Sequence, residues 1–159
     1  MSSIKDRLLD PDVRPHLVRD CCGLIDNSVK STKGFSGIAV KGAYSTVKAI
    51  KRGFVEGVVD ALLDAWIAKL ETFEQEHVKS GRTDKLSAYI VEHKDRVAEA
   101  LITVTDARAE TTKHKTAAKF YNRLRPSALQ HVNDAIPALA GLVDKYADGV
   151  PQGMAAATT

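Results

Sequence analysis

A chain of 159 residues, of which 44 % are hydrophobic, has the size and apolar content of one domain with a single core. Its 23 Lys and Arg residues against 20 Asp and Glu residues leave a formal net charge of +3, far from the strongly basic balance of a dedicated nucleic-acid-binding protein. The N-terminal region has no apolar signal-peptide run, and no stretch reaches the roughly 18 apolar residues that span a bilayer. These observations predict a cytoplasmic protein.

Apolar residues recur at helical spacing along almost the whole chain, and no segment has the strict alternation that predicts a strand. The first predicted element is a short helical segment that contains Ile4 and Leu8. A long helix follows it, with Asp10 as the expected N-cap and Pro11 at the first helical position. The N-terminal part of the chain is therefore predicted to be helical.

The next helix is predicted after a turn at residues 33–37, in which Ser36 is the expected N-cap. This helix ends in a basic cluster before Gly53. The strongest amphipathic pattern then runs from about Phe54 to Lys79, with one wide apolar stripe. We expect this third long helix to lie through the middle of the bundle.

Two glycines, Gly42 and Gly57, fall inside these predicted helices. Glycine at such a position costs about 0.5–1 kcal/mol relative to alanine, because the unfolded chain loses more conformational freedom. We therefore expect a helix backbone to pack closely against each of them, either within the bundle or across a subunit interface, with packing within the bundle favoured.

Helical spacing resumes over residues 86–110, and Thr83 or Asp84 is the expected N-cap. A short polar stretch at residues 93–95 interrupts the pattern, so this segment forms either one helix or two. The predicted fold up to this point is entirely helical.

The last part of the chain predicts a short helix over about residues 117–124 and a separate final helix that starts at Pro126. Pro137 is expected to kink this final helix, because proline removes a backbone hydrogen bond. Residues 150–159 are small and polar and are expected to form a flexible tail. The whole pattern predicts an all-α, single-domain bundle of five to seven helices over residues 1–149.

Several short motifs point to one family. They are Leu8-Leu9-Asp10-Pro11 with Arg14-Pro15, Lys33-Gly34-Phe35-Ser36-Gly37 with Lys41-Gly42-Ala43-Tyr44, Val104-Thr105-Asp106-Ala107-Arg108-Ala109, and Tyr121-Asn122-Arg123-Leu124-Arg125. With these motifs the chain resembles a family of uncharacterised bacterial all-helical proteins, classed as a domain of unknown function. The resemblance implies a helical fold and brings no activity, cofactor or catalytic residue with it.

The best candidate for a metal site is formed by Glu71, Glu74 and His77. Residues three apart share one helical face, and Glu-x-x-His is the spacing of di-iron carboxylate sites in four-helix bundles. Such a site needs a second motif, so Glu92, His93 or a second subunit would have to complete the ligands. The alternative is a solvated polar face at a helix C-terminus, where the helix dipole favours a histidine.

Basic residues cluster on two predicted helices and form a candidate anion-binding site: Lys48, Lys51, Arg52, Lys115, Lys119 and Arg123. If both clusters faced one side, they would bind the phosphates of nucleic acid or of a membrane surface. The alternative is that nearby acidic residues neutralise them in ordinary ion pairs: Glu56, Asp60, Asp106 and Glu110. Asp106 is expected to pair with Arg123 or Arg125.

No motif of a serine nucleophile or of a phosphate-binding loop occurs, so we assign no catalytic residue and no cofactor. The leading functional hypothesis is a non-enzymatic structural or protein-interaction module that self-associates. Such a module would carry an exposed apolar patch of several hundred Å². The alternatives are an anion-binding protein for nucleic acid or a membrane surface, and a metal- or cofactor-binding bundle.

Overall fold

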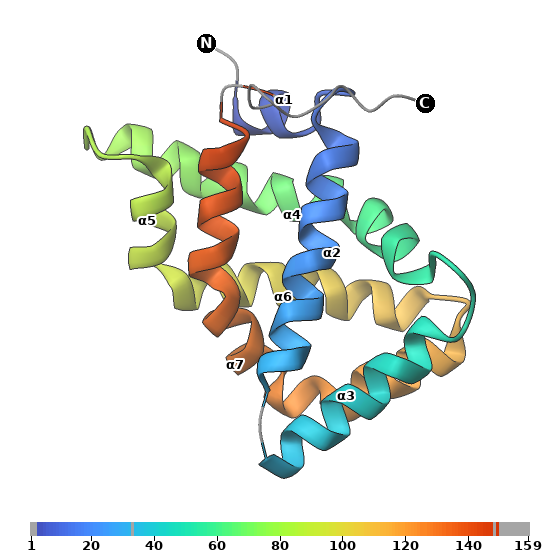
Figure 1. Cartoon of the computed structure of the whole chain (residues 1–159). Helices are drawn as coiled ribbons and strands as arrows, with labels where there is room; N and C mark the ends of the chain where they lie inside the picture. The colour runs from blue at the N-terminus through green and yellow to red at the C-terminus, as the bar shows by residue number, and fades with distance from the viewer. Residues whose placement is uncertain (1–2, 33, 148, 150–159) are drawn as a thin grey trace.

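The structure is a computed structural model that describes residues 3–32, 34–147 and 149. Within these residues the chain forms one bundle of seven α-helices and no strand (Figure 1). The helices are α1 (Ile4–Leu8), α2 (Arg14–Ser31), α3 (Gly34–Lys48), α4 (Phe54–Lys79), α5 (Leu86–Glu92), α6 (Lys94–Thr111) and α7 (Lys115–Lys145). The predicted all-α bundle is confirmed, while the predicted tail at residues 150–159 lies outside the described residues.

The helices cross in two layers (Figure 1). α4 and α6 pack against each other in one layer, and α2 and the second half of α7 run across them. α3 packs against the first half of α7 at the lower end of the view, while α1 packs on α4 at the upper end. This arrangement leaves α3 and the first half of α7 at the periphery of the bundle.

The core is built around α4, as the sequence predicts. Seven residues of this helix are buried, at the spacing of a single face: Phe54, Val59, Leu62, Leu63, Ile67, Leu70 and Phe73. The main apolar cluster joins the middle of this face to α1, α2, α5, α6 and α7 through Ile4, Leu8, Leu17, Ile90, Val97, Ala98, Ile136 and Ala140. Burial of each large apolar side chain contributes about 1.5–3 kcal/mol, so this face holds the bundle together.

All four tyrosines of the chain donate their hydroxyl hydrogen to a carboxylate that also pairs with a Lys or Arg. The groups are Tyr44–Asp26–Lys48, Tyr89–Glu76–Arg96, Tyr121–Asp106–Arg125 and Tyr146–Asp20–Lys145. Burial, followed by the adjacent carboxylate, raises the pKa of each hydroxyl above its usual value, so each stays a donor. Each group links neighbouring helices, and the predicted pairing of Asp106 with Arg125 is confirmed.

The start of α2 differs from the prediction. α2 begins at Arg14, and Pro15 lies in its first turn. Asp10 instead forms a turn before the helix, because its carboxylate accepts a hydrogen bond from the Asp12 amide at 2.8 Å. The prediction that Asp10 and Pro11 begin the helix was wrong. Pro11 and Pro15 are both suited to the first turn of a helix, and the helix has the second of them in its first turn.

Two other predicted N-caps were also wrong. α3 begins at Gly34, whose φ of 78° allows a sharp change of direction, so Ser36 lies inside the helix. α5 follows Lys85 as its N-cap and has no side-chain cap. Thr83 and Asp84 lie before that cap, and the Asp84 carboxylate is held by ion pairs instead.

The last two predicted helices form one continuous helix. α7 runs for 31 residues with Pro126 and Pro137 inside it, although proline within a helix costs about 3 kcal/mol. Burial of Ile136, Ala140 and Val143 on its second half offsets this cost. α7 changes direction along its length (Figure 1). The segment predicted over residues 86–110 forms two helices, α5 and α6, which are divided at His93.

The expected close packing of Gly42 and Gly57 within the bundle is wrong, because no described heavy atom outside their own helix backbone lies within 4 Å of the position of a Cβ at either residue. Gly37 is the glycine that packing requires. A Cβ at this position would lie 2.4 Å from the carbonyl oxygen of Thr32.

We predict that Gly37→Ala lowers the free energy of unfolding by about 1–3 kcal/mol, because the added methyl group pushes α3 away from Thr32. Gly42→Ala on the same helix is the matched control and should raise it by about 0.5–1 kcal/mol. Urea denaturation measures both variants. Equal effects of the two substitutions would contradict the close contact at Gly37.

We predict that Tyr146→Phe lowers the free energy of unfolding by about 1–2 kcal/mol, because the fully buried ring keeps its packing while Asp20 loses a donor. Lys145→Gln removes the more exposed partner of the same carboxylate and should cost less than about 1 kcal/mol. Thermal unfolding of both variants checks the order. A larger effect of Lys145→Gln would show that the ion pair is the stronger contact.

Candidate functional site

The predicted metal-ligating residues all lie on α4 but are not brought together: Glu71, Glu74 and His77. Glu74 accepts hydrogen bonds from the Ile4 amide at 3.0 Å and from Arg7 at 3.0 Å, and so anchors α1. Nε2 of His77 lies 3.1 Å from a carboxylate oxygen of Asp84. Within the described part of the chain, no group of three His, Cys, Asp or Glu side chains is placed to hold a metal ion.

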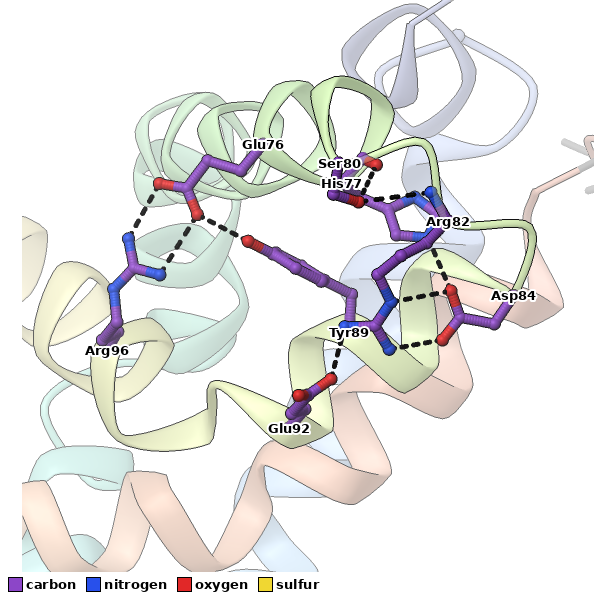
Figure 2. Close-up of polar contacts among 8 residues, drawn as sticks. All are labelled: Glu76, His77, Ser80, Arg82, Asp84, Tyr89, Glu92 and Arg96. Atoms are coloured by element: carbon purple, nitrogen blue, oxygen red, sulfur yellow. Dashed lines mark hydrogen bonds and ion pairs between the residues drawn. The ribbon is translucent and has the colours of Figure 1, made fainter.

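His77 belongs instead to a polar cluster between the end of α4 and α5, shown in Figure 2. We call it the α4–α5 cluster: Glu76, His77, Ser80, Arg82, Asp84, Tyr89, Glu92 and Arg96. The Tyr89 ring lies at its centre, and its hydroxyl donates to Glu76 at 3.0 Å. Arg82 lies 5.2 Å from the centre of this ring and binds both Asp84 and Glu92 at 2.5 Å.

Ser80, His77 and Asp84 are the residue types of a hydrolytic triad, but their contacts are different. The Ser80 hydroxyl donates to the backbone carbonyl of His77 at 2.6 Å, which closes the end of α4. In a Ser-His-Asp triad the serine hydroxyl bonds to the histidine ring, which acts as its base. The contacts of the α4–α5 cluster thus join α4, α5 and α6.

A second polar feature follows from the distribution of charge. Residues 27–55 and 111–133 contain no Asp or Glu. They carry eleven of the 23 basic residues, namely Lys30, Lys33, Lys41, Lys48, Lys51, Arg52, Lys113, Lys115, Lys119, Arg123 and Arg125. All 20 acidic residues lie in the rest of the chain together with the other 12 basic residues, so the small net charge hides a strong segregation.

The fold brings the two acid-free segments together. The ring of Phe54, at the start of α4, meets the ring of His114, just before α7, with centroids 4.9 Å apart. α3 also packs against α7 (Figure 1). Both predicted basic clusters therefore reach the same corner of the molecule, which we call the basic face: Lys48, Lys51, Arg52, Lys113, Lys115, Lys119 and Arg123.

The side chains of the basic face are exposed and mostly lack an acidic partner. In the described residues, Lys48 alone among the seven forms an ion pair, with Asp26 at 3.8 Å. Arg123 lies over the Phe120 ring at 5.3 Å from its centre. α7 begins here without a side-chain cap or an acidic residue in its first turn, so its helix dipole adds to the positive potential.

Of the four acidic residues that were candidates to neutralise these clusters, Glu56 and Glu110 are exposed and form no ion pair with the basic face within the described residues, and the other two are engaged elsewhere. Asp60 accepts a hydrogen bond from Arg14 at 2.9 Å, and Asp106 binds Tyr121 at 2.7 Å and Arg125 at 2.9 Å. The sequence names six residues of the basic face but does not show that they meet. The signal that sequence reasoning missed is the pair of acid-free segments, which net charge conceals.

Few of the large apolar side chains that the structure describes are exposed. In the part of the chain that the structure describes, the large exposed ones are Ile38 at 72 %, Val78 at 71 % and Val91 at 39 %, on three different helices. None of the described helices combines the length and apolarity needed to cross a membrane. The described surface therefore offers charge rather than a broad apolar patch.

Comparison with known proteins gives one match. Residues 4–147 match the Family of unknown function (DUF6918). We found no curated protein and no solved structure that matches the chain.

The ion pairs of the α4–α5 cluster predict how the stability of the protein depends on pH. The Arg82 guanidinium, with a smaller effect of His77, lowers the pKa of Asp84 from 3.8 to about 2. Because the folded pKa lies below the unfolded value, the stabilisation is present above about pH 4 and is lost as the pH falls through 2. Arg82→Ala should move the carboxyl midpoint in an NMR titration up towards 3.8, whereas Lys85→Ala should leave it unchanged. An unchanged midpoint in Arg82→Ala would contradict this pairing.

Proposed function

The chain belongs to this family of unknown function, and we propose that it is a non-enzymatic module that binds a polyanion on the basic face. One observation carries the proposal. Seven exposed cations from segments far apart in the sequence gather where α3, α4 and α7 meet, and six of them lack an acidic partner in the described residues.

Electrostatics explains why such a surface suits a polyanion. Cations within a Debye length of about 8 Å repel one another, and water and salt only partly screen them. A ligand with closely spaced negative charges removes this repulsion and releases its own condensed counterions. A single small anion would engage only part of the basic face.

The remaining polar chemistry supports a binding role rather than catalysis. In the α4–α5 cluster, Ser80 bonds to backbone instead of the His77 ring, and Asp84 is committed to Arg82. Self-association through an apolar patch, the leading hypothesis from the sequence, has less support, because the exposed large apolar side chains of the described residues lie on separate helices.

Retention on immobilised heparin tests the proposal. The double variant Lys115→Glu/Lys119→Glu should elute at lower salt than the wild-type protein, because it reverses two adjacent charges of the basic face. The matched control, Lys69→Glu/Lys94→Glu, makes the same change in net charge at exposed residues of α4 and α6. It should elute between the double variant and the wild type.

Far-UV circular dichroism should show the same helix content for all three proteins. If the two variants elute together, net charge alone governs retention and the proposal of a specific face is wrong. If the wild-type protein passes through heparin without retention at low salt, polyanion binding itself is wrong.

A further inference from the structure

We infer that the ligand of the basic face is the phosphate backbone of double-stranded nucleic acid. This inference rests on the proposed function and specifies its ligand class. Three properties of the surface lead to it: the scarcity of exposed apolar side chains, the engagement of the aromatic rings, and the arrangement of the cations.

The first property separates nucleic acid from a membrane surface. A helix that binds at a lipid interface presents a broad apolar face beside its cations, and cations alone contribute about 1 kcal/mol each. In the described residues of α3 and α7, Ile38 is the one large apolar side chain that is strongly exposed. The row of Lys115, Lys119 and Arg123 on α7 is flanked by none.

The second property separates a duplex from a single strand. Proteins that bind single strands stack the bases on exposed aromatic rings. Here the rings near the cations are engaged: Phe54 is buried against His114, Arg123 covers Phe120, and the Tyr121 hydroxyl donates to Asp106. The basic face thus offers positive charge, while the aromatic rings beside it are in contact with other side chains.

The third property is the arrangement of the cations. Lys115, Lys119 and Arg123 recur every four residues, so each step advances about 6 Å along α7 and the three share one side of the helix. Lys48, Lys51 and Arg52 form a second group across the contact between Phe54 and His114: the two groups come from different helices. A duplex presents two rows of phosphates, one for each group.

Five of the seven cations are lysines, which bind phosphate as point charges rather than through the paired hydrogen bonds by which arginine reads guanine. We therefore expect binding with little dependence on base sequence. Each neutralised phosphate should contribute about 0.9 to the slope of log affinity against log salt for B-form DNA.

Fluorescence anisotropy with the full chain tests the inference. The probes are a short labelled DNA duplex of mixed sequence, a second duplex of different sequence, an RNA duplex, and one labelled DNA strand alone. Co-sedimentation with vesicles of phosphatidylcholine and phosphatidylserine is measured in the same buffer. We expect similar affinity for the two DNA duplexes, at least fivefold weaker binding to the single strand, and no binding to the vesicles.

Salt titration between about 50 and 200 mM then locates the site. Lys115→Gln/Lys119→Gln should lower the slope for duplex DNA by about 2, because each lysine accounts for about one phosphate contact. The control Lys69→Gln/Lys94→Gln should keep the wild-type slope. Loss of slope in both variants, or in neither, would overturn the assignment to this face.

Three other outcomes would overturn the inference. Binding to vesicles without binding to duplexes overturns this inference and leaves polyanion binding intact. Equal or tighter binding to the single strand overturns the assignment to a duplex. Absence of binding to duplexes, single strand, vesicles and heparin overturns both this inference and the proposed function.

Discussion

Burial of the apolar face of α4 is the constraint on which the rest of the structure depends. This helix has 26 residues and is therefore about 39 Å long, too long for one neighbour to cover. Other helices pack along its length, α1 and α6 among them, and each contributes apolar residues to the same cluster. α3 and the first half of α7 lie at the periphery, at the end of the bundle opposite α1.

Polar contacts around this core set the positions of the helices. Each of the four tyrosine hydroxyls reaches a carboxylate that a Lys or Arg also holds, so burial of these polar groups is compensated. The contacts of Arg14 with Asp60 and Asp64, and of Arg7 with Glu74, tie α1 and α2 to α4 in the same way. Many acidic residues are thereby committed to contacts between helices.

The proposed function follows from the cations that have no acidic partner, in the part of the chain that the structure describes, once these carboxylates are paired. The two acid-free segments lie at the periphery, where most of their cations face solvent without partners in the described residues. The α4–α5 cluster shows the opposite arrangement, in which Arg82 and Arg96 are paired with carboxylates from the same neighbourhood (Figure 2). The contrast between these two surfaces supports ligand binding at the basic face and a structural role at the cluster.

The sequence by itself determined the helical class and the limits of α4, because apolar spacing acts over a few neighbouring residues. It also named six cations of the basic face. It left open whether residues 86–110 form one helix or two. Only the tertiary structure decided that α7 continues through Pro126, since distant packing partners offset the cost of a proline. Only the fold could give Glu74 and His77 different partners, on α1 and at Asp84, and bring residues 48–52 to the start of α7. Net charge is a sum over the chain and carries no positions, so the gathering of cations at one corner depends on how the helices pack.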